Sequence, residues 1–356
     1  MITSLEVVGF KRFVSQRFEL SPLTILAGTN GAGKTSVIHS LLLAREALVR
    51  GDGVIELNGP FGLELGEFGD VLNHETMNTF TVSVNSGSSE VNTWSFSAEE
   101  TSLYANVVSP DKQTAFLDKP RAFQYLQAER LGPRITHGTA ALPPDMLEVG
   151  VSGQFCAQVL DVLGGARLKE DEVIHNSAIP LLKAQTEAWM SLITRPLQID
   201  TERFPGTPVT ALKFRTSDLW VKPTNMGFGV TYALPVIIGG LTAASDGIFI
   251  VENPEAHLHP AGQSCMGLFL ARLAASGVQV VVETHSDHVL NGIRLAIGHH
   301  KCLQAQDAIV HYFDSSGAEP LALKFTEVGG ISSWPKGFFD QYQLDVSELT
   351  RIRRPR

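Results

Sequence analysis

Residues 23–43 read LTILAGTNGAGKTSVIHSLLL, and this stretch decides the predicted fold. It opens with a short apolar run at 23–26, which is typical of a buried strand. A complete G-x-x-x-x-G-K-T motif follows at 28–35, and apolar residues then recur at helical spacing from 37 to 42. A strand, a glycine loop and a helix in this order are the context that a phosphate-binding loop (P-loop) requires.

The residue types in this loop suit an anion. Glycines let successive backbone N–H groups converge on one point, and the helix that follows contributes its positive N-terminal end. Lys34 can reach the β- and γ-phosphates of a nucleotide, and the Thr35 hydroxyl can ligate Mg²⁺. A chance glycine-rich turn is the alternative, but every fixed position of the motif is filled. The predicted nucleotide-binding residues of the loop are Gly28, Asn30, Gly31, Ala32, Gly33, Lys34, Thr35 and Ser36.

Composition limits the class of protein. A chain of 356 residues with 44% hydrophobic content can form a globular core in one or two domains. The net charge of −9 argues against a broadly basic nucleic-acid-binding surface, although the tail at 351–356, RIRRPR, is a local basic candidate. The sequence shows no signal-peptide pattern, no paired cysteine spacing and no apolar run of about 20 residues, which favours a soluble cytoplasmic protein.

The segment before the P-loop strand predicts a hairpin. Apolar residues occur in residues 2–20 on both sides of a polar turn that contains Lys11 and Arg12. An edge hairpin with a polar turn explains both cations. A second interpretation places Arg12 beside the bound nucleotide, and the sequence leaves the two open.

The middle of the chain changes character twice. Residues 80–84 and 91–96 show β-type alternation, which predicts an antiparallel patch. Residues 120–200 are predicted to be mostly helical. Within them, Arg130 and Arg134 are expected to be surface ion-pair partners.

Two further strands are predicted at 247–251 and 278–282, because both are continuous apolar runs of the kind found in parallel sheets. The Ala- and Leu-rich helix at 262–275 connects them in a right-handed β-α-β unit. Each strand ends at a glutamate, Glu252 and Glu283. An ATP site needs a carboxylate on the strand beside the P-loop strand, to hold Mg²⁺ or to position water. The run at 248–251 followed by Glu252 fits that need, so this strand is expected beside the P-loop strand.

Five segments together resemble ABC-type P-loop ATPases of the SMC and OLD (overcoming lysogenisation defect) group, often called AAA family ATPases. They are FKRF at 10–13, GTNGAGKT at 28–35, NMGFGV at 225–230, ENPEAHLHP at 252–260 and ETHSDHVL at 283–290. The resemblance implies an α/β fold like an SMC head, with a mixed central sheet around the P-loop, an antiparallel β patch and an inserted helical lobe. A hairpin is expected at 308–328. The predicted parts are 1–49, 50–118, 119–205 and 206–356.

The resemblance also implies roles for single residues. Glu252 takes the place of the Walker B aspartate and is expected to bind Mg²⁺ with Thr35, directly or through water. His285 resembles the switch histidine that senses the γ-phosphate. A degenerate signature loop, which in this family reaches the nucleotide of a second subunit, is expected at Asn225, Gly227 and Gly229.

One position departs from the family pattern. Asn253 stands where the catalytic glutamate is usual, and an amide does not accept a proton as a carboxylate does. Glu255 is the nearest substitute. The predicted catalytic set is therefore Glu252, Asn253, Glu255 and His285, with slow turnover.

The predicted function is that of an ATPase with ATP and Mg²⁺ as cofactors. Nucleotide-dependent dimerisation, or assembly into a higher homo-oligomer, would gate a separate effector such as a nuclease in anti-phage defence or DNA processing. Nucleic acid is an open ligand, and no membrane contact is expected. Three alternatives remain: an ATP-bound scaffold with little turnover, a transporter ATPase subunit, and a metal-dependent hydrolase built on His257, His259, His285 and His288.

Overall fold

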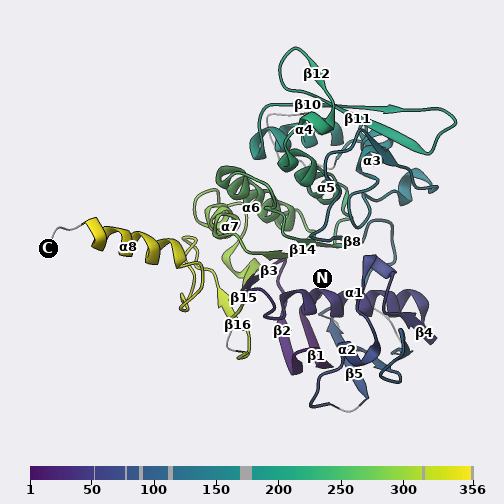
Figure 1. The fold of residues 1–356 in the computed structure, drawn as a ribbon, viewed down its shortest axis with the longest axis vertical. Coiled ribbons are helices and arrows are strands. Elements are labelled where there is room, and N and C mark those ends of the chain that lie inside the picture. Colours follow the sequence, from purple (N-terminus) through teal and green to yellow (C-terminus); the bar gives the residue numbers. More distant parts are fainter. Residues whose placement is uncertain are drawn as a thin grey trace.

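The computed structural model describes residues 1–51, 53–76, 78–87, 91–110, 115–168, 179–314 and 317–353 (Figure 1). The strands are β1 (Ser4–Phe10), β2 (Phe13–Glu19), β3 (Leu23–Gly28), β4 (Gly53–Glu56), β5 (Thr79–Asn85), β6 (Val91–Ser97), β7 (Tyr104–Val108), β8 (Phe123–Leu126), β9 (Thr136–Gly138), β10 (Gln198–Arg203), β11 (Val209–Arg215), β12 (Trp220–Val221), β13 (Ile248–Glu252), β14 (Gln279–Thr284), β15 (Ala308–Phe313) and β16 (Leu321–Lys324). The helices are α1 (Lys34–Arg50), α2 (Phe68–Val71), α3 (Cys156–Leu163), α4 (Leu182–Ile193), α5 (Phe228–Thr242), α6 (Pro260–Ala275), α7 (Asp287–Gly298) and α8 (Gln341–Arg353).

The central sheet has the strand order β16-β15-β3-β14-β13-β8. All neighbours in it are parallel except β15 and β16, so the sheet is mixed. The P-loop strand β3 lies between β14 and β15, and β13 is one strand further away. The strand that ends at Glu252 was expected beside the P-loop strand, and this expectation was wrong because β14 occupies that place. Parallel strands with long apolar runs require cover on both faces, and this sheet has it.

Helix α1 lies between the central sheet and a second, antiparallel sheet of order β2-β1-β5-β6-β7-β4 (Figure 1). One hydrophobic core joins these three layers, and it contains Ile38 and Leu41 of α1 together with Ile250 and Val281 of the central sheet. The alternation of side chains along β13 and β14 therefore directs Glu252 and Glu283 toward the layer that contains α1.

The other face of the central sheet is covered by α3, α4, α5, α6 and α7, with a second core between helices and sheet. Phe249, Val251 and Val282 belong to this core, as their position in the alternation requires. A small sheet of β9, β10, β11 and β12 lies on the outer side of these helices (Figure 1).

The structure confirms the predicted α/β fold with a mixed central sheet around the P-loop. The strands expected at 80–84 and 91–96 form an antiparallel pair, and the hairpin expected at 308–328 extends the central sheet through β15. The β13-α6-β14 unit is also present as parallel neighbours. The boundaries of the four predicted parts remain a prediction.

One secondary-structure prediction was wrong. Residues 120–200 contain α3 and α4 but also β8, β9 and β10 among the described residues. Strand β8 is four buried residues long and pairs with β13. A run this short has no readable period, and its conformation is decided by a neighbour far along the chain.

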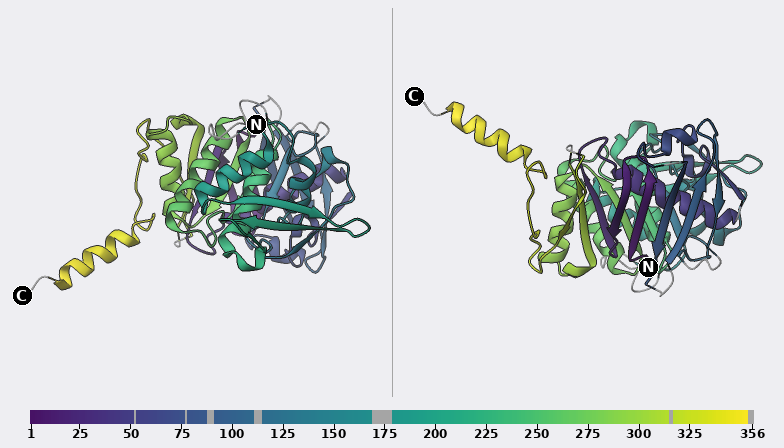
Figure 2. Two further views of the ribbon diagram at one scale, coloured as in Figure 1. Left: turned by 90° about the horizontal axis from the view of Figure 1, so that it is seen from above. Right: turned by 90° about the horizontal axis from the view of Figure 1, so that it is seen from below.

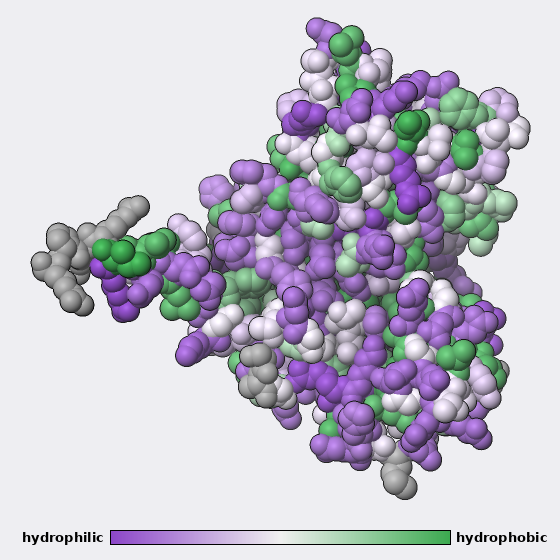
Figure 3. All heavy atoms as spheres, viewed as in Figure 1, coloured by the Kyte–Doolittle hydropathy of each residue, from purple (hydrophilic) through white to green (hydrophobic). Residues whose placement is uncertain are grey.

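Helix α8 extends away from the body of the molecule in both views of Figure 2. Its side chains at 341–352 are exposed, including apolar ones that show as green spheres at the left of Figure 3. The tail at 351–356 was a nucleic-acid candidate, and its last three residues lie outside the described part of the chain. Within that part, no helix is long and apolar enough to span a bilayer.

Candidate functional site

The P-loop connects β3 to α1 and forms the floor of a cavity of about 840 Å³. Gly28, Gly31 and Gly33 have positive φ values of 138°, 71° and 98°, a conformation that glycine adopts without steric cost. Helix α1 begins at Lys34, so its free N–H groups and the positive end of its dipole face the loop. The backbone is thus arranged to hold an anion.

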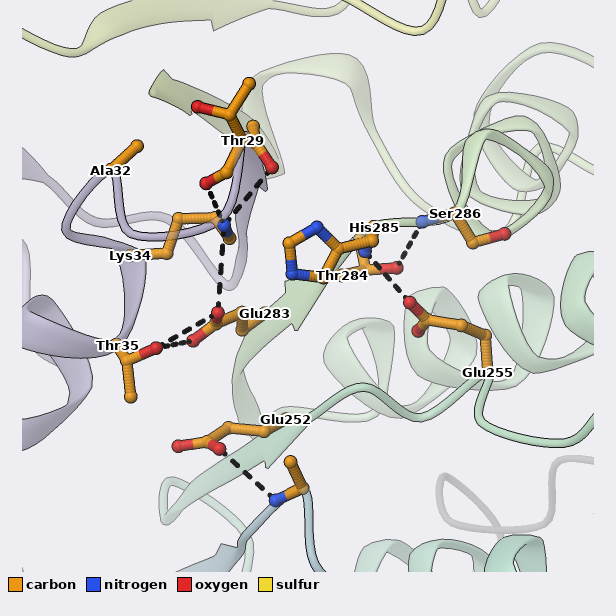
Figure 4. A network of polar contacts seen from close by, with 12 residues as sticks. Thr29, Ala32, Lys34, Thr35, Glu252, Glu255, Glu283, Thr284, His285 and Ser286 are labelled. Atoms are coloured by element: carbon orange, nitrogen blue, oxygen red, sulfur yellow. Dashed lines mark hydrogen bonds and ion pairs between the residues drawn. The ribbon is translucent and has the colours of Figure 1, made fainter. Parts of the chain in front are cut away.

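The side chains of Lys34 and Thr35 both point toward Glu283 in Figure 4. Lys34 Nζ donates to the carbonyl oxygens of Gly28 at 3.1 Å and Thr29 at 2.6 Å. It also lies 3.9 Å from a carboxylate oxygen of Glu283, and Lys34 is only 3% exposed. Burial lowers the pKa of Lys34, and the nearby Glu283 opposes this shift. A buried cation that is held by neutral carbonyls is poised to exchange them for phosphate oxygens.

Glu283 is the carboxylate nearest the loop, and the sequence assigned it no role. Thr35 Oγ1 donates to both of its oxygens, at 2.9 and 3.1 Å. Burial, together with the nearby Glu252, raises the pKa of Glu283 to about 7. The available signal was a glutamate at the end of a second buried strand, but its use depends on β14 being the neighbour of β3.

Glu252 ends β13, one strand further from the loop. Its Oε1 accepts from the hydroxyl of Tyr125 at 2.8 Å, and its Oε2 accepts from the backbone N–H of Ala128 at 3.2 Å. Burial raises the pKa of Glu252, and both hydrogen bonds oppose that shift. Glu252 is therefore a buried carboxylate with both oxygens already engaged.

Arg130 was predicted to be a surface ion-pair partner, and this prediction was wrong. It is 2% exposed, and its Nη1 donates to the carbonyl oxygens of Gln127 at 3.0 Å and Glu252 at 2.7 Å. Its Nη2 donates to the carbonyl oxygen of Asn253 at 2.6 Å. The guanidinium thus holds the end of β13 in place, while Arg134 is exposed as predicted.

The other predicted catalytic residues lie just beyond the strand ends. Glu255 Oε1 accepts from the backbone N–H of His285 at 2.9 Å, and burial raises the pKa of Glu255 (Figure 4). The His285 side chain lines the cavity, and its pKa is lowered by burial and by Lys34, so the imidazole is neutral at pH 7. Asn253 has a left-handed φ of 43°. Its buried Oδ1 has no hydrogen-bond partner in the part of the chain that the structure describes.

Arg12 lies in the polar turn of the β1–β2 hairpin, and its side chain reaches the P-loop; its place beside a bound nucleotide stays a prediction. Its guanidinium donates to the carbonyl oxygens of Ala32 and Ala318, and it lines the cavity. Neighbouring Lys11 also lines the cavity and contacts Nδ1 of His39 at 2.9 Å. The structure brings the following residues together around the cavity: Lys11, Arg12, Asn30, Gly31, Gly33, Lys34, Thr35, Ser36, Gly69, Asp70, Leu72, Asn73, His74, Glu283 and His285.

The predicted signature loop lies elsewhere. Asn225 ends a short 3₁₀ turn, and Gly227 caps the N-terminus of α5. None of Asn225, Gly227 and Gly229 is among the described residues that line the P-loop cavity. Gly229 packs closely on its own chain, because an added Cβ would lie 2.6 Å from the carbonyl oxygen of His257. At Gly227, in contrast, no described atom lies within 4 Å of such a Cβ.

The histidines of the metal-hydrolase alternative are used in other ways. His259 caps α6, His257 packs against the rings of Phe228 and Tyr232, and His288 lies 3.7 Å from Asp287. Among the described residues, no group of three or more His, Cys, Asp or Glu side chains is placed to hold a metal ion.

A magnesium–nucleotide complex needs fewer protein ligands than such a group. Mg²⁺ commonly takes one or two carboxylates together with substrate phosphates and water. The Thr35 hydroxyl and the Glu283 carboxylate are hard oxygen donors beside the glycine cradle, and the Glu252 carboxylate is a third one at the end of the next strand. The donor set therefore fits Mg²⁺ bound beside a phosphate.

Two family models match parts of the chain. An AAA domain described as a putative AbiEii toxin of a type IV toxin–antitoxin system matches residues 161–291, and a protein family of unknown function, DUF3696, matches residues 303–349. The first match does not include the P-loop, so it is independent of the motif at 28–35. A search of curated proteins finds no match.

Solved structures of SMC heads have the same fold. An SMC head bound to the C-winged helix domain of ScpA matches with a TM-score of 0.55 at 12% identity, over 91% of this chain and 97% of that one. An SMC head with an extended coiled coil, bound to the C-terminal domain of ScpA derived from Pyrococcus furiosus, matches with a TM-score of 0.52 at 11% identity, over 99% of both chains. The fold is thus that of an SMC-head-like P-loop NTPase, and the family model supports the ABC and AAA class of ATPases.

Proposed function

We propose that this chain binds ATP with Mg²⁺ in the P-loop cavity and hydrolyses it. The observation that carries the proposal is the convergence of a buried lysine, a hydroxyl and a carboxylate on the N-terminus of α1. This arrangement supplies a backbone cradle and a cation for phosphate, and oxygen donors for a divalent ion.

The residues then have distinct roles. Lys34 would bind the phosphates, and Thr35 would hold Mg²⁺ with Glu252 or Glu283. The bound ion would neutralise charge that develops on the phosphates. Neutral His285 would hydrogen-bond to the terminal phosphate. Glu255 would position His285 by accepting a hydrogen bond from the backbone N–H of His285.

Asn253 supports slow turnover rather than fast hydrolysis. Its amide cannot take a proton from water. Its buried Oδ1, which has no hydrogen-bond partner among the described residues, is an acceptor that could orient a water molecule. Glu255 is a carboxylate with a raised pKa two residues further on, and it remains the candidate general base.

The proposal includes a nucleotide-dependent homodimer. The loop that we propose as the signature loop leads into the N-terminus of α5, where no described atom lies within 4 Å of a Cβ added at Gly227. A helix N-terminus with an unobstructed glycine is suited to approach the phosphate of a second subunit. The dimer would gate a separate effector, for which a nuclease in anti-phage defence or DNA processing is our candidate. The SMC heads solved with ScpA domains support the idea that such heads bind partner proteins.

Gel filtration with light scattering tests this proposal. Wild type with Mg²⁺ and a non-hydrolysable ATP analogue should become a dimer. Gly227→Asp should bind the analogue but stay monomeric, because the new carboxylate would face the partner's phosphate. Its φ of −65° suits aspartate as a helix cap, so the variant should fold.

Gly165→Asp is the matched control, since no described atom lies within 4 Å of an added Cβ there either. It should dimerise like wild type. A wild-type protein that binds the analogue and remains a monomer would contradict the dimer. Dimerisation of Gly227→Asp at wild-type affinity would contradict the role of the signature loop.

Asn253 also favours a second candidate function, a scaffold that binds ATP and hardly turns it over. Phosphate release by wild type, Lys34→Ala and Asn253→Glu separates the two. The scaffold function is supported if wild type and Lys34→Ala release phosphate at the same rate while Asn253→Glu releases it clearly faster. The ATPase is correct if wild type exceeds Lys34→Ala.

A further inference from the structure

We propose that Glu283, and not Glu252, is the carboxylate that ligates Mg²⁺ together with Thr35. This inference rests on the proposed function, because it assigns a ligand within the same site. The sequence resemblance pointed to Glu252, whereas four observations of the structure point to Glu283.

The first observation is the strand order. Glu252 and Glu283 are register partners on β13 and β14, and they extend toward the same layer of the molecule. Strand β14 is paired directly with the P-loop strand, and β13 lies beyond it. Neighbouring strands are about 4.8 Å apart, so the Glu252 backbone is about that much further from the loop.

The second observation is direct contact. Both carboxylate oxygens of Glu283 are within 3.1 Å of Thr35 Oγ1, the hydroxyl expected to ligate the ion. Glu283 also lines the P-loop cavity, and Glu252 is not among the described lining residues. Figure 4 shows Lys34 and Thr35 both directed toward Glu283.

The third observation is that Glu252 is already committed. Its two oxygens accept from Tyr125 and Ala128, and Arg130 holds its carbonyl oxygen. To reach the ion, the Glu252 side chain would have to break hydrogen bonds in a buried environment, where unpaired polar groups are costly. Glu252 is therefore better suited to act on the ion through water or through its charge.

The fourth observation is the balance of charge. Lys34 is the cation next to Glu283, and it now donates to two P-loop carbonyl oxygens. When Lys34 turns to phosphate, Glu283 loses this neighbouring cation, while Glu252 remains its register partner on β13. A divalent ion beside Thr35 restores a positive charge next to Glu283, so phosphate and metal should bind together.

Manganese as a probe tests this assignment by electron paramagnetic resonance. The titration measures the affinity for Mn²⁺ in the presence of adenylyl imidodiphosphate, independently of turnover. Glu283→Gln should lower that affinity at least roughly tenfold, the scale seen when groups that support a metal site are removed. Glu252→Gln is the matched control, with the same substitution at the register partner, and should lower it less than about threefold. An equal or larger loss in Glu252→Gln overturns the assignment.

Glu283→Asp keeps the proposal testable if Glu283→Gln does not fold. Aspartate retains the carboxylate, but its side chain is shorter by one methylene group. The variant should therefore show an intermediate loss of Mn²⁺ affinity. Unchanged affinity in either Glu283 variant overturns this inference alone. A wild-type protein that binds neither the analogue nor Mn²⁺ with it overturns the proposed function as well.

Discussion

Arg130 illustrates how one buried cation can organise a site that it does not enter. Its guanidinium donates to three carbonyl oxygens, two of which belong to Glu252 and Asn253. Burial lowers the pKa of Arg130 to about 10, yet the group stays charged at pH 7. The end of β13 therefore has a fixed conformation before any nucleotide arrives.

Substitution of Arg130 by methionine should destabilise the protein. The change removes the Arg130 donor from the carbonyl oxygens of Gln127 and Glu252, while that of Asn253 keeps the N–H of Ala256. Each buried unsatisfied group costs on the order of 1 kcal/mol or more. We expect Arg130→Met to lower the free energy of unfolding by about 2–4 kcal/mol, measured by chemical denaturation. Arg134→Met is the control, because Arg134 is exposed, and it should change stability by less than about 0.5 kcal/mol. Equal effects of the two substitutions would show that Arg130 does not hold the strand end.

His39 should make the protein sensitive to acid. Burial and the neighbouring Lys11 lower the pKa of His39 to about 3, whereas an unfolded histidine titrates near 6.5. Below pH 6.5 the unfolded chain takes up a proton that the folded chain refuses, so stability falls as the pH drops toward 3. The loss amounts to at most about 1.4 kcal/mol per pH unit.

The comparison with His39→Gln isolates this effect. Glutamine can accept from Lys11 Nζ but does not titrate, so melting temperatures of the two proteins should diverge between pH 6.5 and 4. The melting temperature of the wild type should fall further than that of His39→Gln. Parallel pH profiles would show that His39 is protonated in the folded state as readily as in the unfolded one.

Site residues were predictable from sequence where the chemistry is local. The P-loop residues follow one another in the chain, so the motif identified Lys34 and Thr35 directly. Glu283 and Arg130 could not be assigned in the same way. Their roles depend on β14 lying beside β3 and on the turn after β8 lying beside the end of β13, which only the folded chain determines.

At the scale of elements, the P-loop depends on β15 as much as on its own glycines. Phe313 at the end of β15 is the register partner of Gly28, and its carbonyl oxygen accepts from the Thr29 N–H at 3.1 Å. A Cβ at Gly28 would lie 1.9 Å from that oxygen. The end of β15 therefore fixes the start of the loop.

Gly28→Ala should disrupt both strand pairing and nucleotide binding. Backbone must move to relieve the contact with Phe313, and φ at this position is 138°. We expect loss of several kcal/mol in stability and loss of binding to a fluorescent ATP analogue. Gly277→Ala is the control: φ is 97° there, but no described atom lies within 4 Å of an added Cβ, so only about 1 kcal/mol of backbone strain is expected. If both variants lose the same stability and binding, then backbone strain, and not the contact with β15, is the reason that glycine is needed at position 28.

Element types were predictable where the periodic pattern is long or the residues are uniformly apolar. The α6 helix and strands β13 and β14 were predicted correctly for this reason. Strand β8 was missed because four buried residues, FQYL, show no period of their own. Its conformation comes from pairing with β13.

At the scale of the whole molecule, the P-loop cavity and the predicted signature loop occupy separate places. The cavity opens at the N-terminus of α1, between the central sheet and the antiparallel sheet, and the predicted signature loop leads into α5 in the helical layer. One chain alone does not place the loop in the cavity, which is why the proposed cycle needs two. The sequence motifs implied this fold, and the separate role of the signature loop stays a prediction. The small outer sheet of β9 to β12 came from the structure.

The central claim is that the glycine cradle and Lys34 bind a nucleoside triphosphate. Calorimetric titration of a non-hydrolysable ATP analogue with Mg²⁺ into wild type and Lys34→Ala tests it most directly, with circular dichroism to verify that both are folded. Loss of a charge-assisted contact to phosphate should weaken binding by roughly 10- to 100-fold. Measurable binding by wild type that is weakened in Lys34→Ala by this amount is the predicted result. No binding by wild type, or equal affinity in the two proteins, would contradict the claim.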